Sequence, residues 1–328
     1  MKTTIRLAEE KDKDNIISLL NSVFKNQQRS DTLRNDKYWK WKFTVTPFGK
    51  SVLTVAESND EIIGVDNLWP WEFNIRGTMY RAYQPCDTVV HPKARGKSLF
   101  KNMRLHGLEV IKENNPAFLF NFPNNQSINE NISLGWFNMG QIPWMVRLIR
   151  PFDVIKSVFK TSKTEAILID KVYNLNISLL EKLDRDNLNY SGYIKHSRKE
   201  GYFEWRYLQH PGRHYGMIYL EKGKYASSAV FTVNQRGSYK EMFIVEIIGN
   251  PKITYDLLNK ASAIAKRMEI SILALMYNSS FNMKKLWQLG FIKYRSKNMT
   301  VLPLNLNFET ILRSFVNWSM FACLHDSI

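Results

Sequence analysis

The stretch that decides the fold is TVVHPKARGKSLFKNM, residues 88–103. Thr88, Val89 and Val90 predict a short strand, and Pro92 and Gly96 predict the turn that follows it. Apolar residues at helical spacing after the turn predict an amphipathic helix. In this order of strand, basic turn and helix, the first turn of the helix has unpaired N–H groups that point outward at the basic turn. The positive end of the helix dipole lies at the same place, so an anion is favoured there. The stretch therefore predicts a site for a pyrophosphate group.

The residues expected to hold this anion belong to the turn and to the start of the helix. Gly96 has no side chain, so the backbone can approach phosphate oxygens closely at this point. Basic side chains next to Gly96 add positive charge. The candidate set is Arg95, Gly96, Lys97, Ser98, Leu99 and Phe100.

The stretch resembles motif A of the GNAT acyltransferases, in which a strand and a proline precede an Arg-Gly-x-Gly-x-Gly/Ala turn that opens a helix. Arg95, Gly96 and Lys97 match this pattern, whereas Ser98 stands at the usual second glycine and Phe100 at the usual third glycine or alanine. The rest of residues 1–150 follows the family order. Its elements are strands at 4–7, 51–56, 61–65 and 117–122, a first helix at 12–24 and a closing Leu-Gly-aromatic triplet at 134–136.

The resemblance implies a mixed α/β fold that uses acetyl-CoA as acyl donor and an amine as acceptor, with direct attack in a ternary complex. It also implies that the strand at 88–90 splays from the strand at 117–122, so that the pantetheine arm enters between them. A backbone N–H of Val89 or Val90 would then polarise the thioester carbonyl. Asn124 would contact the pantetheine arm, or would form a plain Asx turn.

The attacking amine must lose a proton, so a base is expected within reach. Asp87 is the first candidate because it stands just before the strand centre, and Tyr83 is the second. The alternative for Asp87 is an exposed strand-end residue or a turn cap. In the family a tyrosine four residues before the closing glycine protonates the leaving thiolate. Asn131 stands at that position here, so this acid is missing or comes from elsewhere.

The chain also repeats itself. Residues 38–43 (YWKWKF) with Pro47 recur as residues 202–207 (YFEWRY) with Pro211, every matched pair 164 positions apart. Further downstream, Leu134-Gly135-Trp136 recurs as Leu289-Gly290-Phe291. Such self-similarity predicts two copies of one α/β unit. At the repeated Trp-Lys and Trp-Arg pairs we expect structural tryptophans beside solvated bases.

The second copy lacks the anion-binding turn. After Pro251 it has no Arg-Gly-Lys and no glycine, so we expect it to bind no CoA and to shape the acceptor cleft or pack against the first copy. The predicted organisation is two tandem GNAT-like domains, each a central mixed β-sheet flanked by helices. Their expected bounds are a GNAT domain at 1–150, a linker with helices at 151–198 and a degenerate GNAT-like domain at 199–328.

Composition limits the compartment and the partners. The 328 residues include 46 Lys and Arg against 30 Asp and Glu, and the net charge of +16 favours anionic partners. Two cysteines cannot form a disulfide framework, and no signal segment or membrane span is recognised, so a cytoplasmic protein is expected. No metal site is expected, because Pro211 and Gly212 break the helix that would pair His210 with His214.

Residues 308–324 predict an amphipathic helix, with Ile311, Leu312, Phe315 and Trp318 at helical spacing. A peripheral membrane contact is one role for such a helix. Arg313 is the single basic residue of this segment, whereas membrane-surface helices carry several, so packing against the core is favoured.

Taken with the resemblance, these features predict a bacterial N-acetyltransferase similar to the tandem GNAT proteins of surface-polysaccharide biosynthesis. The acceptor expected from that resemblance is the amine of an anionic small molecule, an amino sugar that is nucleotide-linked. A tandem-GNAT transferase acting on a cell-wall or amino-acid acceptor is the alternative enzyme. A non-catalytic CoA sensor or a basic nucleic-acid scaffold is the alternative outside catalysis, and the sequence lacks the dense mixture of aromatic and basic residues that would favour nucleic acid.

Overall fold

The computed structural model describes residues 3–24, 34–96, 98–124, 127–157, 164–169, 173–187 and 194–325. Its strands are β1 Thr4–Leu7, β2 Val52–Ser58, β3 Glu61–Ile75, β4 Thr78–Val90, β5 Phe118–Asn121, β6 Phe137–Leu148, β7 Thr164–Ala166, β8 Ile194–His196, β9 Tyr215–Lys222, β10 Tyr225–Arg236, β11 Tyr239–Gly249, β12 Ile272–Met276, β13 Ile292–Pro303 and β14 Trp318–Ser319. Its α-helices are α1 Lys13–Phe24, α2 Asp36–Trp39, α3 Leu99–Ile111, α4 Ser127–Ser133, α5 Pro151–Ser157, α6 Ile177–Arg185, α7 Thr254–Arg267, α8 Met283–Gln288 and α9 Glu309–Leu312.

The strands join into one continuous mixed sheet, which confirms the expected α/β class. The strand order is β1-β2-β3-β4-β5-β13-β6-β12-β11-β10-β7; β9 pairs with β10, and β8 pairs with β3 and β14. Tight turns connect the long hairpins. Asn59 and Asp60 between β2 and β3, and Arg76 and Gly77 between β3 and β4, have positive φ, as two-residue hairpin turns require.

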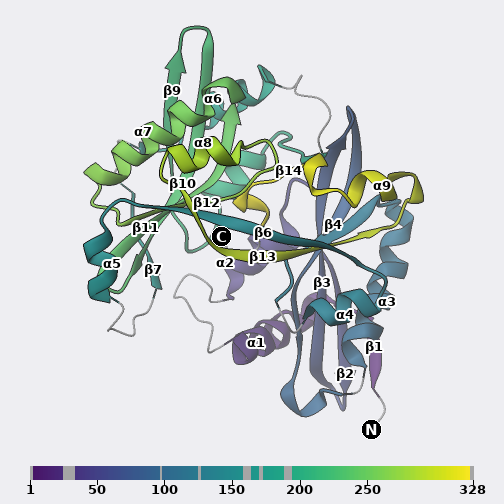
Figure 1. The fold of residues 1–328 in the computed structure, drawn as a ribbon. Helices are drawn as coiled ribbons and strands as arrows, with labels where there is room; N and C mark the ends of the chain where they lie inside the picture. Colours follow the sequence, from purple (N-terminus) through teal and green to yellow (C-terminus); the bar gives the residue numbers. More distant parts are fainter. Residues whose placement is uncertain are drawn as a thin grey trace.

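Two strands cross between the halves of the sheet. β6 follows the first series of strands but pairs with β12 of the second series, and β13 follows the second series but pairs with β5 of the first. β6 and β13 also pair with each other in antiparallel fashion and run through the middle of the molecule (Figure 1). The sheet therefore runs across the domain boundaries that the sequence predicts.

Helices cover both faces of this sheet. α3 packs on the first half over two small clusters, one that includes Met103 and one that includes Ile111. α7 packs on the second half over a cluster that includes Leu257 and Leu258. The largest core lies on the other face and contains side chains from both halves. Within the described ranges, no helix has the length and apolar character needed to cross a lipid bilayer.

The expected helix at 308–324 is wrong. The chain forms only the short α9 there, then turns, adds β14 to the edge of β8 and ends in a short 3-10 turn. Trp318 and Cys323 are fully buried, and the Nε1–H of Trp318 donates to the carbonyl of Leu312 at 2.9 Å. The segment is thus part of the core, as its shortage of basic residues favoured, but it fills an irregular space that a straight helix would not fit.

Trp41 and Trp205 join the repeated segments at the centre of the largest core. The Nε1–H of each indole donates to the backbone carbonyl of the other tryptophan, at 2.8 and 2.9 Å. Their rings are stacked with centroids 5.6 Å apart and an interplanar angle of 19°. This reciprocal contact ties together two segments that lie 164 residues apart in the chain.

We predict that Trp41→Phe lowers the free energy of unfolding by about 1–3 kcal/mol, because it leaves the buried carbonyl of Trp205 without its donor. Urea unfolding followed by circular dichroism measures the change. Trp287→Phe is the matched control, because Trp287 is 60% exposed, and it is expected to change stability by less than about 0.5 kcal/mol. Equal effects of the two substitutions would contradict the structural role of the pair.

Candidate active site

The parallel strands β4 and β5 pair over only a short length. Ala82 lies opposite Phe118 and Tyr83 lies opposite Leu119, and β4 then continues to Val90 with no further pairing to β5 among the described residues. The two strands therefore diverge towards their carboxyl ends. This divergence matches the splay that the family resemblance implies, next to the turn expected to bind an anion.

The backbone N–H of Val90 faces this opening. Opposed residues of an antiparallel ladder alternate between hydrogen-bonded and non-hydrogen-bonded pairs. His91 donates its N–H to the carbonyl of Ile63 on β3 at 2.8 Å, so the next pair, Val90 with Gly64, is a non-hydrogen-bonded one. The N–H of Val89 consequently points towards β3, and that of Val90 points to the β5 side. Of the two expected donors, the register favours Val90.

The turn between β4 and α3 lies at the surface. Arg95, Gly96 and Ser98 are exposed, and Gly96 and Ser98 both have left-handed backbones, with φ of 82° and 55°. Leu99 begins α3 and is buried against Ala94. Lys97 lies outside the described residues. The arrangement places a basic residue and the N-terminal end of a 13-residue helix at the same exposed point.

A buried ion pair holds α3 on the sheet. Arg104 of α3 donates two hydrogen bonds of 2.7 Å to the carboxylate of Asp66 on β3, and both side chains are 1% exposed. The hydroxyl of Thr88 on β4 donates to the same carboxylate at 2.6 Å. Because one carboxylate joins α3, β3 and β4, the helix start is fixed relative to the splay.

Two expected contact residues have local partners. The Phe100 ring lies 5.2 Å from the guanidinium of Arg104, one helical turn later, and so packs along α3. The side-chain oxygen of Asn124 accepts hydrogen bonds from the N–H and the hydroxyl of Ser127, at 2.9 and 3.0 Å. Among the described residues, the contacts of Asn124 are therefore those of an N-cap of α4 and not of a plain Asx turn, and its side chain is exposed near the end of β5.

Asp87 is at the centre of a buried ionic cluster. Its carboxylate contacts the guanidinium of Arg34 and the ammonium of Lys42, both at 2.7 Å, and accepts a hydrogen bond from the Tyr38 hydroxyl at 3.0 Å. Burial alone would raise the pKa of Asp87, but the charges of Lys42 and Arg34 outweigh burial and hold that pKa well below its usual range. Burial, with the charge of Asp87, raises the pKa of Tyr38.

This geometry argues against Asp87 as the general base. A carboxylate stabilised by two cations has little affinity for a proton at neutral pH. Tyr83 does not replace it, because it is 1% exposed and packs under α3 with Ile111 and Leu119, whereas Asp87 contacts α2 and the turn after it. The structure does not bring the two expected proton-transfer residues together.

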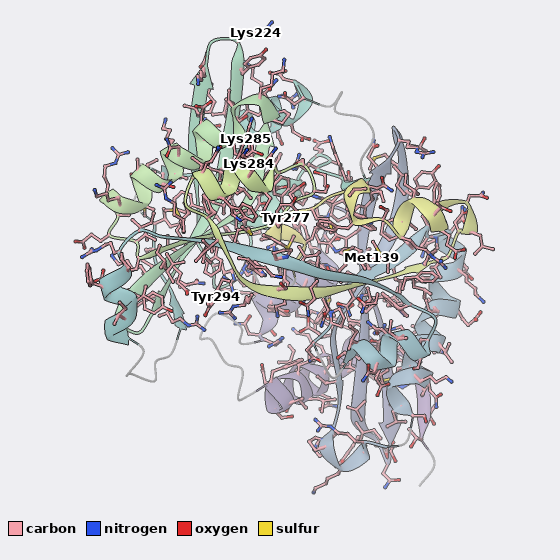
Figure 2. The ribbon with its side chains drawn as sticks, in the orientation of Figure 1. Met139, Lys224, Tyr277, Lys284, Lys285 and Tyr294 are labelled. Atoms are coloured by element: carbon pink, nitrogen blue, oxygen red, sulfur yellow. The ribbon has the colours of Figure 1, made fainter. Side chains whose placement is uncertain are left out.

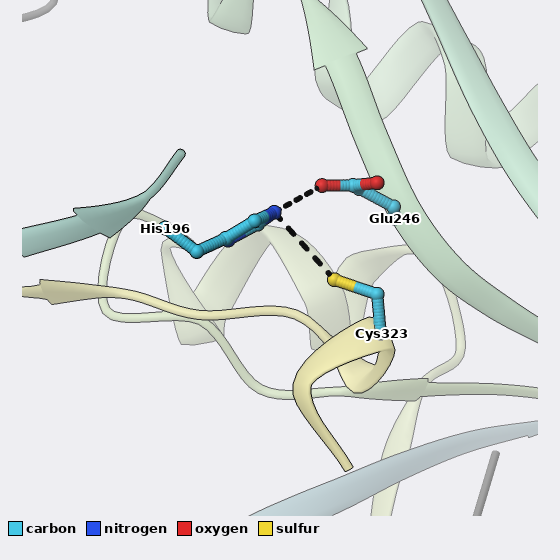
Figure 3. Close-up of side chains that lie close together, drawn as sticks. All are labelled: His196, Glu246 and Cys323. Atoms are coloured by element: carbon cyan, nitrogen blue, oxygen red, sulfur yellow. Dashed lines mark hydrogen bonds and ion pairs between the residues drawn. The ribbon is translucent and has the colours of Figure 1, made fainter. Parts of the chain in front are cut away.

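The second half of the chain contains a matching cluster. Glu246 stands 159 residues after Asp87, and its carboxylate contacts Arg198 and His196, both at 2.7 Å, and accepts a hydrogen bond from Tyr207. The charge of Arg198, with hydrogen bonds from His196 and Tyr207, outweighs the effect of burial and lowers the pKa of Glu246. Burial lowers the pKa of His196, so this ring contributes as a hydrogen-bond donor. Cys323 lies 3.8 Å from the Nε2 atom of His196 (Figure 3).

His196, Glu246 and Cys323 offer ligand atoms within 4.8 Å of one another, a grouping that the sequence did not reveal. Arg198 and Tyr207 already bind the carboxylate, and burial with the charge of Glu246 raises the pKa of the Cys323 thiol. A divalent cation held by these three residues would need Cys323 as a thiolate and a carboxylate of Glu246 that is free to bind it. The cluster is therefore better suited to hydrogen bonding than to metal binding.

One expectation about the repeated segments is wrong. Lys42 and Arg206 are not solvated bases: their exposed fractions are 0% and 1%. Lys42 is paired with Asp87, and both Nε and Nη2 of Arg206 donate to the carbonyl of Cys323, at 3.1 and 2.8 Å. The repeat itself could have indicated this burial. Arg34 and Arg198 also stand 164 positions apart, so both repeated segments are preceded by an arginine at the same distance.

Comparison with known proteins supports the observed fold and identifies one domain in the first half of the chain. Residues 4–137 match the family model described as the acetyltransferase (GNAT) domain. No curated protein matches the sequence. The match places a GNAT domain in the first half of the chain, as the sequence predicts, and acyl transfer from CoA is the chemistry that this domain suggests.

Solved structures resemble the chain over nearly its whole length. A GCN5-related N-acetyltransferase from Anabaena variabilis has a TM-score of 0.65 at 12% identity, over 93% of this chain and 74% of that one. A conserved protein from Enterococcus faecalis, a probable N-acyltransferase, has a TM-score of 0.63 at 7% identity with the same coverage. N-myristoyltransferase from Saccharomyces cerevisiae, with myristoyl-CoA bound, has a TM-score of 0.56 at 11% identity over 97% of this chain and 89% of that one. At these identities the likeness establishes the fold.

We predict that Asp87→Asn lowers the free energy of unfolding at pH 7 by about 3–5 kcal/mol, because it leaves two buried cations without their carboxylate. The pKa of Asp87 is lower in the folded than in the unfolded protein. Its ion pairs therefore stabilise the fold fully above about pH 5 and progressively less as the pH falls below about 4. Urea unfolding at several pH values measures the difference between the proteins, which is expected to shrink in acid.

The control is Asp256→Asn. Asp256 forms an ion pair of 3.0 Å with Lys222 at the surface, where its side chain is 46% exposed, so the expected loss is below about 1 kcal/mol. A stability loss from Asp87→Asn that is small or independent of pH would contradict the ionic role of the cluster.

Proposed function

We propose that this protein transfers an acetyl group from acetyl-CoA to the primary amine of an anionic small molecule, a nucleotide-linked amino sugar of bacterial surface-polysaccharide synthesis. The observation that carries the proposal is the divergence of β4 from β5 directly before an exposed basic turn and the N-terminus of α3. Such an opening suits a pantetheine arm, and such a helix start suits a pyrophosphate.

In this proposal the turn binds the donor. Arg95 contributes charge, and the backbone at Gly96 and Ser98 approaches the phosphate oxygens, with Lys97, Leu99 and Phe100 beside them. Asn124 lies near the end of β5, where the arm would pass. Arg104, through Asp66 and Thr88, keeps the turn and the splay in register.

The chemical step is direct attack on the thioester. The amine nitrogen forms a bond to the carbonyl carbon, the carbon–sulfur bond breaks, and CoA leaves as the thiolate. The proton that the amine gives up passes through water to this thiolate. The N–H of Val90, next to Val89 on β4, would stabilise the negative charge that develops on the carbonyl oxygen. Holding both substrates together supplies much of the remaining rate. We assign Asp87 a positioning role, because its ion pairs join β4 to α2, and assign no proton transfer to Tyr83.

Calorimetric titration with acetyl-CoA, and with myristoyl-CoA as a second donor, tests donor binding. Release of free thiol in the presence of amino sugars tests transfer. We expect micromolar binding of acetyl-CoA and thiol release that depends on the amine. Absence of binding by either acyl-CoA would overturn the proposal.

We predict that Gly96→Ala weakens acetyl-CoA binding at least tenfold, because a methyl group would separate the backbone from the phosphate oxygens. The free protein has room for this methyl group, with no atom within 4 Å of the added carbon. Gly223→Ala is the matched control, because Gly223 also has a positive φ and no atom within 4 Å but lies in the β9–β10 turn. Equal binding by the two variants would place the donor elsewhere.

A further inference from the structure

A cleft of about 390 Å³ lies on the second half of the sheet. Glu241 and Phe243 of β11 line it, whereas Met242 and Ile244, which alternate with them, pack in the core beneath α7. The cleft therefore lies on the sheet face opposite α7. Tyr294 of β13, which also lines the cleft, lies below the crossing strands β6 and β13 in Figure 2, whereas Lys284 and Lys285 of α8 lie above them. We name this space the cationic cleft.

The floor of the cationic cleft is apolar and its rim is charged. Trp144 and Ala274 form part of the floor and are 6% and 3% exposed, and Trp144 contacts Phe243 edge to face at 5.9 Å. The charged residues among those that line the cleft, apart from the histidine described next, are Arg213, Arg236, Glu241, Arg295 and Lys297. Four cations against one carboxylate leave a positive net charge, although Arg236 pairs with Glu241 at 3.4 Å.

The cationic cleft adjoins the splay of β4 and β5 through the C-terminal segment. His325 lines the cleft, and its ring stacks on Phe122 with centroids 5.4 Å apart. Phe122 directly follows β5, whose end borders the splay. The preceding residue, Leu324, accepts a hydrogen bond of 2.9 Å from Gln84 of β4 at its backbone carbonyl. The C-terminal segment thus borders the cleft at His325 and contacts β4 at Leu324, next to the place proposed for the thioester.

From these contacts we infer that the cationic cleft binds the acyl acceptor and recognises a phosphate group on it; this inference rests on the proposed function. Arg295 and Lys297 of β13 hold the phosphate at the rim, and the aromatic floor holds the ring. The amine then points past His325 towards the splay. A volume of about 390 Å³ is near the lower end for small-molecule sites and suits the sugar and one phosphate of the proposed acceptor, with its nucleotide outside the cleft.

The test uses glucosamine 6-phosphate and its neutral parent glucosamine, with acetyl-CoA as donor and thiol release as the readout. The phosphorylated amine is expected to have at least a tenfold higher kcat/KM. The double variant Arg295→Gln with Lys297→Gln should abolish this preference by raising the KM for the phosphorylated amine. Neither residue is buried, so both substitutions are compatible with folding. A preference that is absent in the wild type, or that survives in the double variant, would overturn the inference.

Lys293→Gln is the matched control. Lys293 is exposed on the same strand but does not line the cationic cleft, so removing its positive charge should leave the phosphate preference intact. Loss of the preference in this variant would indicate a general effect of charge and contradict a specific site.

A binding measurement separates this inference from the proposed function. Calorimetric titration of glucosamine 6-phosphate without acetyl-CoA should show binding to the wild type that weakens at least tenfold in the double variant. Glucose 6-phosphate, which lacks the amine, should bind with the same dependence and release no thiol. Absence of binding by both sugar phosphates would overturn the cleft assignment even if acetyl-CoA binds. Failure of acetyl-CoA to bind would overturn the proposed function and leave the calorimetric result to decide the cleft.

Discussion

The antiparallel pairing of β6 with β13 is the constraint on which the rest of the structure depends. Each strand leaves the series that precedes it and completes the sheet of the other half, so neither half has a complete sheet alone. The exchange places the backbone hydrogen bonds of both halves in one ladder, where an unpaired buried N–H or C=O would be costly. It also brings β13, with its cations, beside the first half.

Two buried carboxylates reinforce this arrangement. Asp87 and Glu246 occupy matching positions. Each pairs with an arginine that precedes the repeated segment, Arg34 or Arg198, and accepts a hydrogen bond from a tyrosine within that segment. The two clusters also differ: the second contains His196, and Lys42 contacts Asp87 directly, whereas Arg206 donates to the carbonyl of Cys323. That difference recruits the C-terminal segment into the core of the second half. The same segment lines the cationic cleft at His325 and contacts β4 beside the splay at Leu324.

The roles proposed for the two halves of the sheet also differ. In the first half, diverging strands and a basic turn leave backbone groups accessible at the point where an acyl-CoA would bind. In the second half, the turn before α7 has no glycine, and the opposite face of the sheet has an apolar cleft with a positive rim. One repeated unit can therefore support donor binding and acceptor binding through different faces of a shared sheet, because function depends on local side chains and not on the fold alone.

The sequence by itself determined the local elements and their repetition. β-branched runs, turn residues and helical spacing predicted the strand, turn and helix around Gly96, and the 164-residue offset located the paired tryptophans. Only the tertiary structure decided that β6 and β13 cross over, that Lys42 and Arg206 are buried, and that residues 308–324 bend into the core. It also showed that Asp87 is paired with two cations, which its position in the sequence did not reveal. The physical reason is the sequence separation of the interacting residues. Periodicity and turn chemistry involve residues that are a few positions apart. Strand exchange and ion pairing depend on groups that are dozens to hundreds of residues apart in the chain.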